Sequence, residues 1–424
     1  MLIAVVIIFA VTYAAIALED PIGVSKSATA LLGAGLLWAI YALSTADHVR
    51  IADEVNDTIG STAQIIFFLM GAMTIVEVID AHGGFEIITS RIRTNRLTSL
   101  LWLVSWVTFV LSAILDNLTT TVVMVSLIGK LLSNARDRLL FASIVVIAAN
   151  AGGAWSPIGD VTTTMLWIGG QVSAQGIIKG VFLASVFNLL VPLLVITFGL
   201  RGRVFAPNAT ASAVSRTPAE RNVIFTLGLG LLVAVPAFKQ VTHLPAFLGS
   251  LLALGLLWLT GELIHRSKQT ESRSPLTVAQ ALSRIDHSSL LFFVGILLAV
   301  ATLEHSKLLA ALAGWLDQTV ASQEVIVLLL GLLSAVIDNV PLVAASMAMY
   351  ALPLYPVDSF LWEFIAYCAG TGGSILIIGS AAGVAAMGIE RIQFLWYMRK
   401  VSGLATLGYL AGAVVYIVQY RLTQ

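Results

Sequence analysis

The chain has 424 residues, of which 58% are hydrophobic and only 11% are charged. This composition and about a dozen long apolar stretches exclude a soluble globular domain and indicate an all-α protein that crosses a membrane many times. The 23 basic and 23 acidic residues give a net charge of zero, so the overall charge does not favour nucleic acid as a partner. A single cysteine, Cys368, excludes an internal disulfide.

The first apolar stretch, 1–18, ends near an Ala-Ile-Ala sequence that resembles a signal-peptide cleavage site, but no Lys or Arg precedes it. A signal peptide normally has a basic region there, so we expect a first spanning helix instead. Hydropathy predicts further apolar segments at 27–45, 61–80, 97–132, 139–168, 176–200, 222–238, 244–264, 288–303, 323–353, 360–390 and 395–420.

Two of these segments are interrupted by nearly the same polar phrase. Segment 97–132 contains Ser-Ala-Ile-Leu-Asp-Asn at 112–117, and segment 323–353 contains Ser-Ala-Val-Ile-Asp-Asn at 334–339. The first segment is too long for one helix, and each of its arms has only about 17 residues. A pair of full crossings would fit, but we favour a re-entrant hairpin in each segment, with the Asp-Asn tip buried in protein near the midplane.

Segments 139–168 and 360–390 also share an internal pattern. Each contains a glycine pair, in Ala-Asn-Ala-Gly-Gly at 149–153 and Ala-Gly-Thr-Gly-Gly at 369–373, and a later helix breaker, Ser-Pro-Ile-Gly-Asp at 156–160 and Ile-Gly-Ser at 378–380. Glycine and proline inside a spanning helix free backbone carbonyls, which a membrane tolerates only where they line a site or cavity. These segments are therefore predicted to be discontinuous helices that meet the hairpin tips.

Charged residues at the segment ends predict the orientation of the chain. The first hairpin is flanked by basic residues and the second by acidic ones, so their ends should face the cytoplasm and the outside, respectively. The basic residues are Arg91, Arg93, Arg96, Lys130, Arg136 and Arg138, and the acidic ones are Asp317, Glu324 and Asp358. Asp47, Asp53, Glu54 and Asp57 indicate an outer loop, whereas Arg201, Arg203, Arg216 and Arg221 indicate a cytoplasmic linker at 201–221.

Counting crossings from these positions places the amino terminus outside and gives the two halves opposite orientations. We therefore expect an all-α polytopic membrane protein with two inverted-topology repeats, at 1–200 and 222–424. Each repeat would contain three helices, a re-entrant hairpin, a discontinuous helix and a final helix.

The four breaks gather oxygen-bearing side chains of the type that a small, hard cation prefers. The candidate cation ligands are Asp116, Asn117, Thr119, Thr120, Asn150, Ser156, Asp160, Thr162 and Thr163 in the first half and Ser334, Asp338, Asn339, Thr371, Ser374 and Ser380 in the second. A buried carboxylate can hold either a proton or a metal cation, so Asp116 and Asp160 could exchange one for the other.

Some of these residues also have a purely structural interpretation. Threonine and serine in membrane helices often bond only the carbonyl of the preceding turn. Asp338 could cap the second arm of its hairpin, whereas Asp116 and Asp160 are expected to be functional. His82 and His305, at the ends of apolar segments, are expected to be interfacial.

The Asp-Asn tips and the run Asn-Ala-Gly-Gly-Ala-Trp-Ser-Pro-Ile-Gly-Asp-Val-Thr-Thr-Thr at 150–164 resemble the NhaD-type sodium/proton antiporters of the ion transporter superfamily. The resemblance covers nearly the whole chain. It implies exchange of cytoplasmic sodium or lithium for external protons, without a cofactor, by a multi-pass protein of the cell inner membrane that is not an enzyme. It also implies a homodimer whose scaffold domain holds a moving, elevator-type transport domain.

The sister dicarboxylate carriers have a Ser-Asn-Thr tip where this chain has Asp116 and Asn117, and the added carboxylate would repel an anion. An arsenite or other oxyanion transporter of the same superfamily remains an alternative, because it would give the same hydropathy and repeats. An intramembrane protease is disfavoured, since no Gly-x-Gly-Asp pattern or Ser/His pair accompanies the carboxylates.

Overall fold

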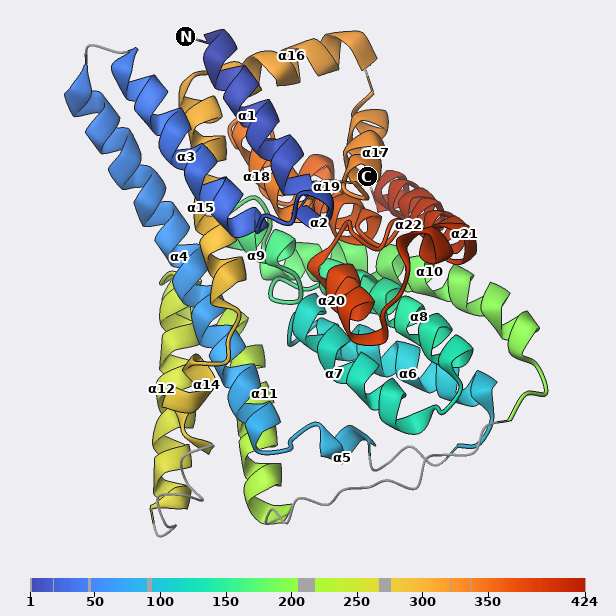
Figure 1. Cartoon of the computed structure of the whole chain (residues 1–424). Helices are drawn as coiled ribbons and strands as arrows, with labels where there is room; N and C mark the ends of the chain where they lie inside the picture. The colour runs from blue at the N-terminus through green and yellow to red at the C-terminus, as the bar shows by residue number, and fades with distance from the viewer. Residues whose placement is uncertain are drawn as a thin grey trace.

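The computed structural model describes residues 2–17, 19–44, 47–89, 94–204, 218–266, 276–320, 322–336 and 338–423. Arg91, Arg93 and Arg216, the side chain of Lys130 and most of the expected 201–221 linker lie outside the described residues. Apart from one isolated bridge between Arg96 and Val204, the regular structure of the described residues is helical (Figure 1).

The first half of the chain contains ten helices among the described residues, with two breaks in its apolar segments. Its helices are α1 (Leu2–Ala17), α2 (Glu19–Ile22), α3 (Lys26–Leu43), α4 (His48–Ala81), α5 (Glu86–Thr89), α6 (Leu97–Ser112), α7 (Asn117–Leu131), α8 (Ala135–Ala154), α9 (Val161–Ile168) and α10 (Ala174–Leu200). The breaks between α6 and α7 and between α8 and α9 fall at the polar phrases of the sequence.

The second half has the same kinds of break. Its helices are α11 (Pro218–Thr242), α12 (Ala246–His265), α14 (Val278–Leu282), α15 (His287–His305), α16 (Leu308–Val320), α17 (Gln323–Leu333), α18 (Asn339–Met349), α19 (Phe360–Gly372), α20 (Ala381–Glu390), α21 (Phe394–Lys400) and α22 (Ser402–Thr423). The chain breaks after α17 and α19, again at the residues that the sequence pattern indicates.

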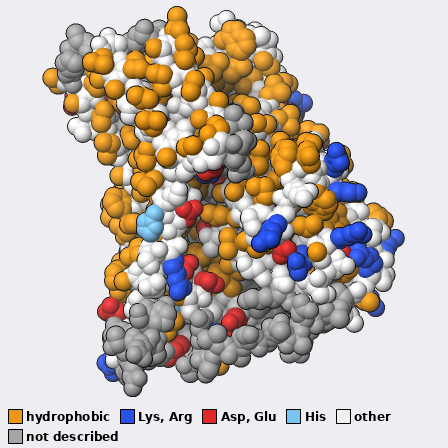
Figure 2. Space-filling view, in the orientation of Figure 1, with side chains coloured by type: hydrophobic (Ala, Val, Ile, Leu, Met, Phe, Trp, Pro, Cys, Tyr) orange, Lys and Arg blue, Asp and Glu red, His pale blue; other side chains and the backbone are white. Residues whose placement is uncertain are grey.

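Eight described helices are long and apolar enough to cross a membrane, namely α3, α4, α8, α10, α11, α12, α15 and α22. Large hydrophobic side chains such as Leu32, Leu259 and Val414 are exposed on them, as expected of surfaces that face lipid. Figure 2 shows that hydrophobic side chains cover much of the face in view. The chain is therefore a multi-pass membrane protein, as its composition predicted.

Helix α4 differs from the sequence-based expectation at its amino end. It has 34 residues and begins after Asp47, whose side chain caps it by accepting a hydrogen bond from the amide of Arg50 at 3.0 Å. Asp53, Glu54 and Asp57 therefore lie within a helix and not in an outer loop. The cap and an Arg50–Glu54 ion pair at 3.5 Å, one helical turn apart, explain why this polar stretch is helical.

The helices pack into two groups, which Figure 1 shows side by side. The α4 group consists of α1, α3, α4, α11, α12, α14 and α15, and the α8 group consists of α6 to α10 and α17 to α22. Helices α9 and α18 contact both groups, since α9 packs on α4 and α18 packs on α15. The breaks that precede α9 and α18 therefore lie close to the boundary between the groups.

One histidine lies in a different environment from the one predicted. His82, expected at the membrane interface, is buried, and its Nε2 lies 2.9 Å from Nε2 of His265 in α12. The rings are stacked, with their centroids 5.1 Å apart. The contact joins the end of α4 to α12. Because the two histidines are 183 positions apart in the sequence, local sequence pattern could not reveal it.

Candidate functional site

Four helices begin at the breaks, and a side chain caps each of them. Asp116, Asp160, Asp338 and Ser380 accept hydrogen bonds from the amides of Thr119 at 2.8 Å, Thr162 at 2.9 Å, Val340 at 3.3 Å and Gly383 at 3.2 Å, respectively. A carboxylate at this position satisfies a free amide and complements the positive end of the helix dipole. Asp116 and Asp160 thus have the capping role that the sequence argument considered only for Asp338.

Asp160 is the centre of the polar cluster at the breaks. Its side chain is buried, and Asn117 at the start of α7 donates Nδ2 to its Oδ2 at 2.6 Å. Asn339 at the start of α18 lies 3.5 Å from the same oxygen, and the Thr162 hydroxyl donates to Oδ1 at 2.9 Å. The starts of α7 and α18 therefore both meet the break before α9.

Asn150 in α8 joins this cluster to the second discontinuous helix. Its Oδ1 accepts from Asn117 Nδ2 at 3.0 Å. Its own Nδ2 donates to the hydroxyls of Ser374 at 2.8 Å and Ser380 at 2.9 Å. The hydrogen-bond network therefore includes a residue at each of the four breaks. Asp116 and Asp338 each precede a residue of this network in the sequence.

Asp116 adjoins the cluster through its neighbour Asn117. Its Oδ2 accepts from the Thr119 hydroxyl at 2.7 Å, and its backbone has φ 142°. That region is one that residues other than glycine rarely adopt, and strain of this kind concentrates at functional sites. The geometry at Asp116 is consistent with a residue retained for function.

Several of the predicted ligands donate their hydroxyl hydrogen to a backbone carbonyl. Ser156 donates to Ala113, Thr163 to Asp160, Ser334 to Ala369 and Thr371 to Tyr367. The Ser156 and Ser334 bonds join different segments at the breaks, whereas those of Thr163 and Thr371 are local to their own helices. Each hydroxyl oxygen keeps lone pairs. The Thr120 hydroxyl is buried and has no hydrogen-bond partner among the described residues.

The contacts that hold hairpin and discontinuous helix together recur in the two halves. Ser112 donates to the Ala149 carbonyl at 2.6 Å, as Ser334 does to the Ala369 carbonyl at 2.8 Å. Four glycines permit the same close approaches, because a Cβ would meet the carbonyl of Phe109 at Gly152, Gly331 at Gly372, Ser112 at Gly159 and Ser334 at Gly379. In each half the end of the helix before the Asp-Asn pair, α6 or α17, therefore packs on the broken helix through equivalent residues.

Asp338 differs from Asp116 and Asp160 because it has a cationic partner. Its Oδ2 lies 3.0 Å from Nζ of Lys26, at the start of α3. None of the ion pairs found among the described residues involves Asp116 or Asp160. Lys26 was not among the predicted site residues. It is 312 positions from Asp338 in the sequence, and only its place beside an apolar segment could have indicated a role in the site.

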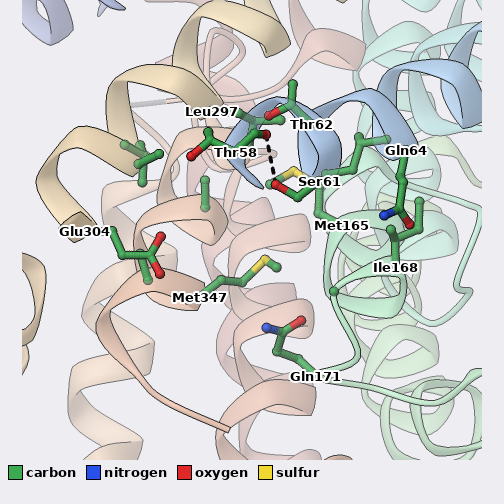
Figure 3. Close-up of a pocket in the computed structure, with 16 residues that line it drawn as sticks. Thr58, Ser61, Thr62, Gln64, Met165, Ile168, Gln171, Leu297, Glu304 and Met347 are labelled. Atoms are coloured by element: carbon green, nitrogen blue, oxygen red, sulfur yellow. Dashed lines mark hydrogen bonds between the residues drawn. The ribbon is translucent and has the colours of Figure 1, made fainter. Parts of the chain in front are cut away.

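A cavity of about 400 Å³ lies between α4, α9, α15 and α18 (Figure 3). Figure 3 shows Thr58, Ser61, Gln171, Glu304 and Met347 around it. Because the cavity shares α9 and α18 with the cluster, it brings open space close to the boundary between the helix groups.

The sequence model of the citrate transporter family matches residues 5–370. Sodium/proton antiporter 1 of Arabidopsis thaliana is 48% identical over 422 residues, which are 99% of this chain and 73% of the plant protein. The Na(+)/H(+) antiporter NhaD of Vibrio cholerae is 30% identical over 451 residues, covering 98% of this chain and 91% of the bacterial protein.

The chain belongs to the NhaD-type sodium/proton antiporter family. The resemblance predicted from the run at 150–164 and the two Asp-Asn tips is thereby confirmed. The crystal structure of the Alcanivorax borkumensis YdaH transporter also matches the fold, with a TM-score of 0.56, 14% identity and coverage of 89% of this chain and 90% of that one. At that identity the match shows the fold alone.

Proposed function

We propose that this protein exchanges sodium or lithium ions for protons across a membrane. Cation and proton would compete for Asp160 and Asp116. The observation that carries the proposal is the environment of Asp160, which is buried among amide and hydroxyl groups and has no ion-pair partner among the described residues. A carboxylate in that position needs a proton or a cation to compensate its charge.

The neighbouring side chains suit a small cation that has lost its water. Asn117, Asn150 and Asn339 have amide oxygens, and rotating an amide can turn its oxygen from a neighbouring donor to an arriving ion. Thr119 and Thr162 add hydroxyl oxygens that already bond the two carboxylates, and Thr120 adds a buried hydroxyl one residue after Thr119. Asparagine and threonine oxygens are hard ligands, whereas the described residues contain no cluster of three His, Cys, Asp or Glu side chains typical of transition-metal sites.

A transported anion fits this site less well. The description of the matching family names citrate, which carries several negative charges near neutral pH, but Asp116 and Asp160 would repel such a substrate. Lys26 is already paired with Asp338. No specific contact favours an arsenite or oxyanion substrate, so the cation remains the better proposal.

We also propose that the two halves are inverted repeats and that the α8 group moves against the α4 group. The recurrence of the Ser112 and Ser334 contacts supports the repeat, because equivalent packing is expected of duplicated halves. The division of the helices into two groups, with the polar cluster near their boundary, supports the movement. On the same reasoning α6–α7 and α17–α18 would be re-entrant hairpins.

The family resemblance and the exposed apolar surfaces support a proposal for the assembly and location of the protein. We propose a homodimer in the cell inner membrane, with the α4 group as the stationary scaffold at the dimer contact. A scaffold is expected to have broad lipid- or partner-facing apolar surfaces, and α3, α11 and α12 expose several large hydrophobic side chains.

A sodium jump in proteoliposomes tests the proposed activity. Purified protein would be reconstituted with a trapped pH-sensitive dye, and sodium, lithium, potassium or citrate would then be added outside. We expect added sodium or lithium to make the lumen more alkaline, because the cations that enter are exchanged for protons that leave, and we expect no response to potassium or citrate. Absence of a sodium response, or a response to citrate alone, would contradict the proposal.

A further inference from the structure

The two hairpin tips have the same Asp-Asn pair but differ in how their charge is compensated. Asp116 accepts hydrogen bonds from the amide and hydroxyl of Thr119 in its own helix, at 2.8 and 2.7 Å. Asp338 accepts from the Val340 amide at 3.3 Å and forms an ion pair with Lys26 at 3.0 Å. Among the described residues, only the tip of the second half therefore has an ammonium group against its carboxylate.

The surroundings of Lys26 hold its ammonium group at this tip. The side chain leaves the first residue of α3, and its Nζ lies 4.7 Å from the centroid of the Phe292 ring in α15. The side chains of Lys26 and Asp338 are only 21% and 13% exposed, so water screens the pair weakly. Other charged groups near the ammonium are Glu19, which accepts from the Lys26 amide at 3.0 Å, and Asp286 at the start of α15.

The second half lacks the other charged and amide ligands of the first. When the glycine pairs of the discontinuous helices are aligned, Ser380 stands where the first half has Asp160, and Gly370 stands where it has Asn150. Asp338 is then the one carboxylate that the second half contributes at its two breaks. Because Lys26 compensates it, the cluster retains two carboxylates without a cationic partner, both in the first half.

We propose that Lys26 is a permanent counter-charge that occupies the place of a transported cation at Asp338. Lys26 would thereby restrict ion exchange to Asp116 and Asp160, and it would set how many charges move in each cycle. Lys26 is in this sense a positioning residue, which acts on the transported ions through Asp338. The inference rests on the proposed sodium/proton exchange and adds the origin of its stoichiometry.

The number of protons exchanged per sodium ion tests this role directly. It can be measured in proteoliposomes as the combination of sodium and pH gradients that gives no net flux, at a membrane potential clamped with potassium and valinomycin. This ratio does not depend on how much protein is active. The variants are Lys26→Gln, Lys26→Arg and the double variant Lys26→Gln with Asp338→Asn, compared at neutral and alkaline pH.

Arg138→Gln is the matched control, because Arg138 and Glu390 also form an ion pair at 3.0 Å but lie away from the hairpin tips. We expect Lys26→Gln to shift the exchange by one charge per cycle at alkaline pH, where the released Asp338 takes part. Lys26→Arg, the double variant and Arg138→Gln should all keep the wild-type ratio. The double variant keeps it because removing both partners leaves the net charge of the tip unchanged.

An unchanged ratio in active Lys26→Gln would overturn the proposal. If Lys26→Gln does not fold, the double variant decides the question. Loss of exchange by a folded double variant would mean that Asp338 itself binds the transported ion, which would also overturn the proposal. Failure of the proposed function is distinguishable from these outcomes, because the wild-type protein would then show no sodium-driven proton movement at all.

Discussion

Asn150 joins the two halves of the site by hydrogen bonds on both ends of its side-chain amide. Its amide oxygen accepts from Asn117 of the first hairpin, and its amide nitrogen donates to Ser374 and Ser380 of the second discontinuous helix. A side chain with both a donor and an acceptor end is needed for this role. Position 150 therefore requires a side-chain amide, a requirement that its place in a glycine-rich helix does not reveal.

Replacing Asn150 by alanine should destabilise the protein and weaken sodium binding. The change removes three buried hydrogen bonds, one from the Asn117 amide and two to the hydroxyls of Ser374 and Ser380, at a cost of about 1–3 kcal/mol. We expect a lower melting temperature in detergent and a higher apparent Km for sodium. Ser143→Ala is the control in the same helix, because that hydroxyl donates only to the Leu139 carbonyl one turn away. Equal effects of the two substitutions would argue against a bridging role.

The charges of Asp116 and Asp160 can be separated from their capping roles. Asparagine is as good a helix cap as aspartate but cannot carry a negative charge. Asp116→Asn and Asp160→Asn should therefore fold and insert normally yet abolish sodium-driven proton movement in proteoliposomes. Asp47→Asn, which changes the cap of α4 in the same way outside the cluster, should exchange like the wild type. Normal exchange by either site variant would remove that residue from the proposed site.

At the scale of single elements, the breaks were predictable because each is encoded locally. Asp-Asn after an apolar run, and Gly-Gly followed by Pro or Gly, cannot continue a helix without leaving polar groups unsatisfied. The structure starts α7, α9, α18 and α20 at these positions. The extension of α4 back to His48 was missed, because caps and ion pairs between turns outweighed the polar composition of that stretch.

The close packing of each hairpin on its discontinuous helix depends on glycine. A Cβ at Gly152 would overlap the Phe109 carbonyl, and one at Gly372 would overlap the Gly331 carbonyl. Gly152→Ala and Gly372→Ala should therefore each lower the melting temperature, with an overpacking cost of about 1–3 kcal/mol. Gly255→Ala in α12 is the control, because nothing lies within 4 Å of the added Cβ. That variant should be as stable as the wild type or slightly more stable.

The opposite orientation that we propose for the two hairpins predicts opposite labelling of their ends. In a Cys368→Ala background, a cysteine at Arg136, just after the first hairpin, should react with an impermeant maleimide only from the cytoplasmic side. A cysteine at Gln323, at the start of the second hairpin, should react only from outside. Labelling of both positions from the same side would contradict the inverted repeat.

At the scale of the whole molecule, the residues that form the site could be predicted from the sequence, but their contacts with one another could not. The residues of the cluster come from phrases that stand out in any apolar chain, because carboxylates and amides are costly in hydrocarbon. Their pairing could not be predicted, since Asp160 meets Asn339 and Asp338 meets Lys26 across more than a hundred residues of chain. The cavity beside α9 and α18 depends on how the two helix groups dock, which no local pattern encodes.

The central claim is that cation and proton compete for the same carboxylates, and a pH series of initial exchange rates tests it most directly. Protonated Asp116 or Asp160 cannot bind the cation, so lowering the pH should raise the apparent Km for sodium. The maximal rate at saturating sodium should stay constant, because enough sodium displaces the proton. A maximal rate that falls with pH while Km stays constant would contradict competition and would indicate separate sites for the two ions.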